Sequence, residues 1–193
     1  FSISGGTATL SSATPSSISI SGNVYTLGIS LSGTPDGSET LTVNPASATA
    51  IYDAGNNAST ASQSNNTATL NDQTAPSAFT TGTVATTGGT VTSGYWNSTN
   101  TGLSVSVPIA NDASLTDGTV QLKGKTGSNS YADLGSAVTI TSSDLGGTIS
   151  ATATAAQFEA LTGFADAAAD TITAAITDKA GNSTTGTVSA TVL

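Results

Sequence analysis

The chain has 193 residues, a formal net charge of −9, and 3 basic residues against 12 acidic ones. Nucleic-acid binding needs basic side chains that displace counterions from phosphates, so this class of function is excluded. An anionic membrane surface is disfavoured as a partner for the same reason. Because no run of about 18 apolar residues occurs, the sequence also predicts no direct insertion into a membrane.

The chain has few charged or aromatic residues and is rich in Ser, Thr, Gly and small apolar residues. This mixture favours many short strands with tight turns, in which Thr and Ser occupy the polar face of each strand. Cys is absent, whereas a small secreted eukaryotic module would be expected to carry disulfides. The absence of Cys favours a microbial surface protein. Because the chain opens at Phe1 with neither Met nor a signal peptide, we expect a mature protein or an excised fragment.

The N-terminal part alternates short strand-forming segments with turns. Strands are expected at Thr7–Leu10, Ser17–Ile20, Tyr25–Leu31, Glu39–Val43 and Ala68–Leu70. The segment 72–77 contains Pro76 and turn-forming polar residues, so it is predicted to link a first module, 1–71, to a second module, 78–193.

The C-terminal part has a clearer period of two. Leu103, Val105, Val107 and Ile109 alternate with Ser and Pro residues, as expected for a strand with one buried face. The same alternation recurs further along the chain, at Val120 and Leu122, at Val138 and Ile140, at Ile149, Ala151 and Ala153, at Ile172, Ala174 and Ile176, and at Val188, Ala190 and Val192. Short strands at this spacing predict a β-sandwich.

One segment of the second module departs from the strand pattern. Thr154 and Gln157 have the spacing of a capping box, which marks the start of a helix. Phe158 and Leu161 follow as apolar residues, and Gly163 is predicted to be the glycine C-cap. We therefore expect one or two helical turns at 155–162, crossing between the two sheets.

An acidic residue followed by a Gly-Asn pair recurs near the end of each module, at Tyr52–Asn57 and at Thr177–Asn182. A Gly-Asn pair supplies the positive-φ positions of a tight hairpin. The recurrence predicts an internal repeat and hence tandem modules. The Gly-Asn pair lies one residue closer to Asp53 than to Asp178, so the two turns are expected to differ.

These segments, with Ile18–Asn23 and Asn71–Pro76, resemble the tandem immunoglobulin-like repeats of giant bacterial surface proteins and adhesins. The resemblance covers nearly the whole chain. It implies an all-β fold of two tandem immunoglobulin-like antiparallel β-sandwich modules, with one short helix in the second. It also implies a repetitive extracellular stalk, often stiffened by calcium, with adhesive tips elsewhere.

The first module is shorter than an immunoglobulin-like sandwich, which needs about 100 residues and seven strands. Two explanations stay open. The repeat is truncated and lacks its first strands, or a neighbouring molecule supplies the missing strand by β-strand addition.

Groups that could catalyse a reaction are sparse. Hydrolysis by paired carboxylates needs two acids across a cleft, but Glu39 and Glu159 fall in different modules and are expected to be exposed surface residues. A Ser nucleophile would lack its base, because the chain has no His. The sequence therefore predicts a protein that is not an enzyme.

Carboxylate and amide oxygens are the metal ligands that this sequence offers in quantity, and they suit Ca²⁺. In an immunoglobulin-like sandwich, several loops would gather at the pole where the linker residue Asp72 arrives. These loops contain Asn111, Asp112, Asp117, Asp178 and Asn182. We expect either a structural calcium site at this junction or ordinary turn residues that cap their own backbone.

Tyr95 and Trp96 are adjacent aromatic residues, which on a β-sandwich can form a platform for glycans. A single Trp more often fills a core or seals a module interface, so both interpretations stay open. Asn-x-Ser/Thr sequons, which are candidate glycosylation sites, begin at Asn57, Asn65, Asn97 and Asn182.

The predicted function is that of a structural or adhesive extracellular protein at the cell surface, a stalk-like repeat segment of a large microbial adhesin. Its expected partners are neighbouring copies or modules of the same protein, and surface glycans. Two alternatives stay open: a subunit of an extracellular filament assembled by β-strand exchange, and a carbohydrate-binding module. Structural Ca²⁺ is the one cofactor expected.

Overall fold

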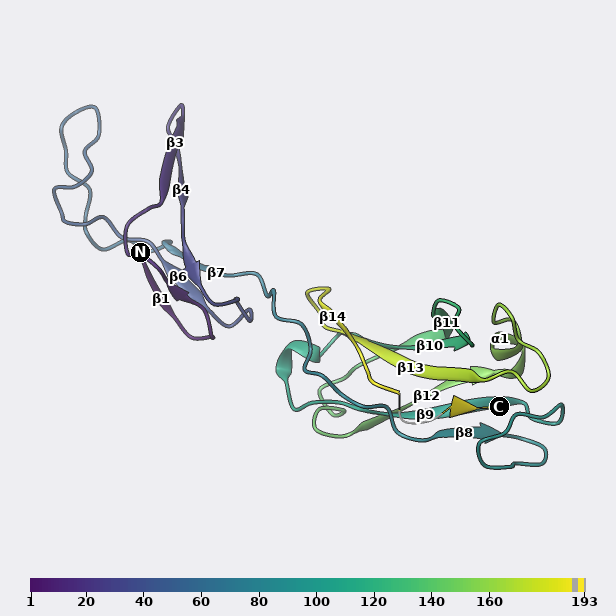
Figure 1. Ribbon diagram of the computed structural model, residues 1–193. Helices are drawn as coiled ribbons and strands as arrows, with labels where there is room; N and C mark the ends of the chain where they lie inside the picture. The colour runs from purple at the N-terminus through teal and green to yellow at the C-terminus, as the bar shows by residue number, and fades with distance from the viewer. Residues whose placement is uncertain (189–190, 193) are drawn as a thin grey trace. The chain divides into compact units, whose positions relative to one another are not determined.

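A computed structural model describes residues 1–188 and 191–192 of the chain (Figure 1). The chain is all-β with one short α-helix in its second part, as predicted. It divides into two compact units, Phe1–Thr74 and Ala75–Leu193, here called unit 1 and unit 2. The division falls inside the segment 72–77, which the sequence predicts to be a linker.

Unit 1 consists of short strands in three small antiparallel sheets. β1 pairs with β6 and β6 with β7, while β2 pairs with β5 and β3 with β4. The strands are β1 (Ser2–Ser4), β2 (Thr9–Leu10), β3 (Ser17–Ser21), β4 (Val24–Gly28), β5 (Leu31–Ser32), β6 (Thr40–Thr42) and β7 (Thr67–Thr69). The expected strands all have counterparts, but Tyr25–Leu31 is divided between β4 and β5, and β1 was not predicted.

Very little of unit 1 is buried. Among its described residues, the buried side chains are Ala8, Pro35 and Glu39. The expectation that Glu39 is an exposed surface residue is wrong, because its side chain is 0% exposed. Its carboxylate accepts hydrogen bonds from the backbone N–H groups of Thr7, Ala8, Asp36 and Gly37, so it holds the polypeptide backbone where unit 1 has few apolar side chains to bury.

Unit 2 is a β-sandwich of two sheets that face each other in Figure 1. One sheet has the order β12-β9-β8; the other has the order β11-β10-β13-β14, and β15 also pairs with β13. The elements are β8 (Val84–Thr87), β9 (Gly102–Pro108), a 3-10 turn at Ala113–Leu115, β10 (Thr119–Thr126), β11 (Ala132–Thr139), β12 (Thr148–Thr154), α1 (Ala155–Glu159), β13 (Asp170–Thr177), β14 (Ser183–Thr185) and β15 (Thr191–Val192).

The core of unit 2 lies between these sheets, and the predicted alternation of apolar residues fills it. The alternating residues of β9 and β12 face those of β10 and β13, since strand side chains point to opposite faces in turn. The buried set includes Leu103, Val105, Val107, Val120, Leu122, Ile149, Ala151, Ala153, Ile172, Ala174 and Ile176. Val188 is 36% exposed, and the predicted strand residue Ala190 lies outside the described residues.

Helix α1 connects β12 in one sheet to β13 in the other, which is the predicted crossover. Its capping box is present: Thr154 accepts from the N–H of Gln157, and the Gln157 side chain accepts from the N–H of Thr154. The predicted C-terminus is wrong, because the helix ends at Glu159 with Ala160 as its cap. The N–H of Leu161 donates to the carbonyl of Phe158, a tighter i→i+3 bond that closes the last turn before Gly163.

Candidate functional site

The recurring acidic and Gly-Asn segments form the same turn in both units. The N–H of Asp53 donates to the carbonyl of Asn57 at 3.0 Å, and the N–H of Asp178 donates to the carbonyl of Asn182 at 2.9 Å. In return, the backbone N–H of each Asn donates to the preceding Asp, at 2.9 Å in unit 1 and 2.8 Å in unit 2. The expectation that the turns differ is wrong, since the second Asn of unit 1, Asn57, takes the place of Asn182.

The residue before that Asn explains why the shift in the Gly-Asn pair is tolerated. Asn56 has φ 61° and Gly181 has φ 99°, so both lie in the left-handed region. Gly enters this region freely, and Asn enters it more readily than other side chains. The turn therefore accepts either residue at the same position.

The two copies of the turn differ in what covers them. In unit 2, Ile176 just before the turn is 2% exposed, and its strand β13 is central in the sheet between β10 and β14. In unit 1, the equivalent residue Ile51 is 55% exposed and the next residue, Tyr52, is 48% exposed. The same turn thus follows a core residue in unit 2 and an exposed residue in unit 1.

The five unit 2 residues proposed for calcium lie in two loops that meet. The N–H of Lys179 donates to the carbonyl of Ser114, and the Lys179 ammonium pairs with Asp117 at 2.9 Å. Asp112 caps the 3-10 turn by accepting from Ser114, and Asp178 accepts from Asn182. Asn111 is exposed.

Asp72 belongs to unit 1, where it accepts from the N–H of Thr74. Within the described part of the chain, no group of three or more acidic, His or Cys side chains is arranged to hold a metal ion. The contacts of Asp72, Asp112 and Asp178 are those of turn residues that cap nearby backbone groups. A calcium site at this junction stays a prediction.

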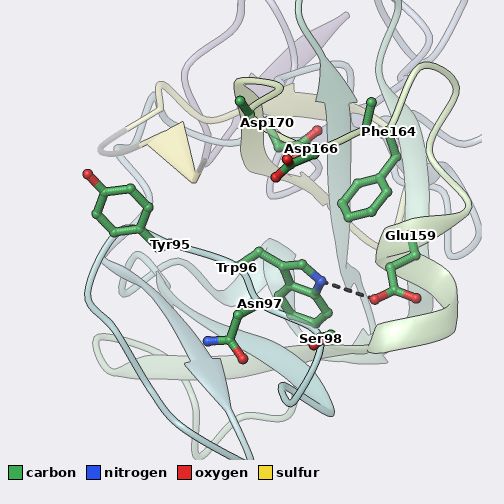
Figure 2. Close-up of a pocket in the computed structure, with 10 residues that line it drawn as sticks. Tyr95, Trp96, Asn97, Ser98, Glu159, Phe164, Asp166 and Asp170 are labelled. Carbon is green, nitrogen blue, oxygen red and sulfur yellow. Dashed lines mark hydrogen bonds between the residues drawn. The ribbon is translucent and has the colours of Figure 1, made fainter.

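A pocket of about 520 Å³ opens on unit 2 beside α1 (Figure 2). Both predicted platform residues, Tyr95 and Trp96, line it, and Figure 2 shows the Tyr95 hydroxyl pointing away from the indole. The residues that complete its lining are Asn97, Ser98, Glu159, Phe164, Ala165, Asp166, Ala167 and Asp170. This volume lies within the range of about 300–1,000 Å³ typical of small-molecule sites.

Trp96 is fixed at the wall of this pocket. Its ring centroid lies 4.8 Å from that of the core residue Phe158, and Phe158 lies 5.4 Å from Phe164. The indole Nε1–H donates to Glu159 at 3.1 Å, the contact drawn in Figure 2. Trp96 thus packs against the edge of the core and also lines the pocket, while a glycan platform stays a prediction.

The pocket carries three carboxylates, from Glu159, Asp166 and Asp170. Asp170 is 2% exposed, and the hydrogen bond that it receives within the described residues comes from the Thr126 hydroxyl. Burial raises the pKa of Asp170, while the Thr126 hydrogen bond acts in the opposite direction. The prediction that Glu159 is exposed is confirmed. Its contact with Trp96 and the acidic residues of the segment 165–170 have no signal in the sequence.

The amides of three of the four sequon residues are hydrogen-bonded. Asn57 and Asn182 donate to Asp53 and Asp178 in the repeated turn, and Asn97 donates to the carbonyl of Thr90. Asn65 is exposed. Attachment of a glycan to any of them stays a prediction.

No protein-family model, curated protein or solved structure matches this chain. Over the part of the chain that the structure describes, no helix has the length and apolar character needed to cross a membrane.

Proposed function

We propose that the chain is a structural and adhesive segment of a large microbial surface protein, built from tandem immunoglobulin-like repeats, and that it is not an enzyme. The observation that carries the proposal is the repeated turn, in which Asp53–Asn57 and Asp178–Asn182 make the same backbone and side-chain hydrogen bonds. We take the recurrence of this turn, with the same bonding, in each of two compact β units as support for a chain built by repeating one kind of module.

The composition supports the same proposal. Charged residues make up 8% of the chain, and Ser, Thr and Gly occupy the exposed strand faces and turns. Repeat modules of this kind act as spacers through their length, so they need a stable fold more than a reactive centre. The sandwich core of unit 2 gives such stability without disulfides, since the chain has no Cys.

This function predicts that the protein lies on the outside of the cells that make it. Antibodies raised against the chain should label the surface of intact cells in electron micrographs, and protease added outside should remove the label. A cytoplasmic protein labelled in the same sections is the control. Label confined to the cytoplasm, or label that external protease leaves intact, would reject the proposal.

A second candidate, a filament subunit joined by β-strand exchange, is favoured by the exposed apolar residues of unit 1. In the β3–β4 hairpin, Ile18 faces Leu27 and Ile20 faces Tyr25, so these residues share one side of the hairpin. Ile18 and Ile20 are each 61% exposed and Tyr25 is 62% exposed. Figure 1 shows the hairpin extending beyond the other strands of unit 1.

An open groove on unit 1 continues from this hairpin. Its volume is about 760 Å³, and its apolar lining consists of Leu27, Val43, Pro45 and Ile51. In unit 2, the residue equivalent to Ile51 is Ile176, which lies opposite Val120 on β10 and is buried with it in the core between the two sheets. A strand with alternating apolar residues, supplied by a second copy, would give Ile51 the kind of neighbour that Ile176 has.

Strand exchange predicts concentration-dependent polymers that electron microscopy and light scattering can detect. The double variant Ile18→Ser with Ile20→Ser should shift the protein to monomer, because it removes apolar side chains from the shared face. Ser19→Ala, on the opposite side of the same strand, is the matched control and should polymerise as before. A monodisperse monomer at every concentration of the unchanged chain would end this candidate.

A further inference from the structure

The pocket beside α1 holds more negative charge than its surroundings compensate. Glu159, Asp166 and Asp170 line it, and none of its described lining residues is Lys or Arg. The three lysines of the chain are engaged elsewhere. Lys123 pairs with Asp133 at 2.6 Å, Lys179 pairs with Asp117 at 2.9 Å, and the ammonium of Lys125 lies 5.0 Å from the centre of the Tyr131 ring.

The buried carboxylate of Asp170 is the strongest indication that the acidic residues of this pocket bind a ligand. An exposed acid needs no explanation, but Asp170 is 2% exposed and still lines the pocket. Removing a carboxylate from water costs free energy unless a partner replaces the lost solvation. The Thr126 hydroxyl replaces only part of it, since it makes a single hydrogen bond to Oδ1.

The walls of the same pocket are aromatic. Trp96, Tyr95 and Phe164 line it, and the indole is held in place by Phe158 and by Glu159. The face of an aromatic ring attracts a cation, most strongly in the case of Trp, and sets of aromatic side chains commonly bind alkylammonium groups. Since the indole N–H is already donated to Glu159 and the ring packs on Phe158, a ligand would contact the part of the ring that lines the pocket.

We propose that this pocket binds an organic ammonium group, with Trp96, Tyr95 and Phe164 contacting its alkyl portion and Glu159, Asp166 and Asp170 balancing its charge. A neutral sugar could stack on Trp96, but it would leave the negative charge uncompensated. A bare metal ion would satisfy the carboxylates without using the aromatic walls. The ammonium group could belong to a quaternary amine or to an amino sugar, and matched probes separate these sources. The proposal is independent of the repeat function.

The test uses the full chain and the fluorescence of Trp96, which is the chain's one Trp and therefore reports on this pocket alone. Choline is titrated against 3,3-dimethylbutan-1-ol, a neutral molecule of nearly the same shape, and glucosamine against N-acetylglucosamine. A saturable change is expected with a cationic probe and binding at least about fivefold weaker with its neutral match, because the cation–π and charge contributions are lost together. A difference in affinity within the choline pair would identify the ligand as a quaternary amine, and a difference within the glucosamine pair would identify it as an amino sugar.

Asp166→Asn is the informative variant, because Asp166 is exposed and its replacement leaves the fold in place. It should weaken binding of the cationic probe by about fivefold, and added NaCl should weaken it further for the unchanged chain. Asp133→Asn removes the same charge outside the pocket and should leave the affinity unaltered.

Three results would overturn the proposal. Equal affinity for the charged and neutral members of each pair would make the pocket an apolar or sugar site. If the Asp166→Asn variant bound the cationic probe as tightly as the unchanged chain, the Asp166 charge would not contribute to binding. No saturable change with any probe, checked by the NMR shift of the Trp96 indole N–H, would mean that the pocket binds no ammonium group.

Discussion

Ile176→Ala is expected to destabilise unit 2 by about 3 kcal/mol, whereas Ile51→Ala, at the equivalent place in unit 1, should cost less than about 0.5 kcal/mol. Truncating a buried Ile removes its transfer free energy and leaves a cavity, because the surrounding side chains relax only in part. Ile176 is 2% exposed in the core, while Ile51 is 55% exposed. Because both residues precede the same turn, the local structure is alike, and the two substitutions differ mainly in how deeply the side chain is buried.

Urea denaturation followed by Trp96 fluorescence measures the stability of unit 2, because Trp96 packs on its core residue Phe158. Amide hydrogen exchange over residues 1–74 measures unit 1 in the same samples. If Ile51→Ala proved as costly as Ile176→Ala, Ile51 would have to be covered in solution. That result would contradict an open unit 1 and would favour its completion by a second copy.

The strands of unit 2 could be predicted because each has one face toward the core and one toward solvent, which makes apolar and polar residues alternate along the sequence. Val105 and Val107 alternate with Ser residues, and both are buried. The start of α1 was equally accessible, since Thr154 and Gln157 interact over three residues of sequence. Its end was not, because Gly163 is a good C-cap only if the helix reaches it, and the chain turns after Glu159.

The pocket could not be predicted, because its parts come from distant segments. Trp96 meets Glu159 only after β9 and β12 have paired and α1 has been placed at the end of β12. Asp170 begins β13, and its burial depends on that strand pairing with β10. In the sequence alone, Glu159 has the pattern of an exposed helix residue, and nothing marks Asp166 or Asp170 as neighbours of an aromatic ring. Their proximity to Trp96 is a property of the fold.

The repeated turn shows a different limit. Aligning the Gly-Asn pairs suggests turns of unequal length, whereas the hydrogen bonds align Asp53 with Asp178 and Asn57 with Asn182. The hydrogen bond between the Asp carboxylate and the Asn N–H requires that the two residues lie four positions apart, and this spacing is the same in both turns. The Gly is secondary, since Asn56 adopts the positive φ that Gly181 provides.

Glu39→Gln is expected to destabilise unit 1 by about 3 kcal/mol, a large part of what so small a core can supply. Oε1 accepts from the N–H groups of Thr7 and Ala8 at 2.9 Å, and Oε2 accepts from the N–H groups of Asp36 and Gly37 at 3.1 Å. Gln places an NH₂ group at one of these positions, so donors would face donors and buried N–H groups would lose their acceptor. Hydrogen exchange at Thr7 and Ala8 should accelerate, and Glu159→Gln, on the exposed helix α1, should leave unit 1 unchanged.

The same carboxylate makes unit 1 sensitive to acid. Burial raises the pKa of Glu39, but the backbone N–H groups that surround it outweigh burial and leave the pKa below its ordinary value. A folded-state pKa below the unfolded one means that the stabilisation is complete above the unfolded pKa, about 4.3, and is lost as the pH falls through the lower folded value. Hydrogen exchange over residues 1–74, corrected for its intrinsic pH dependence, should therefore show a loss of protection below about pH 4 in the unchanged chain. Glu39→Gln should flatten this pH dependence, and a variant that kept it would show that another acid is responsible.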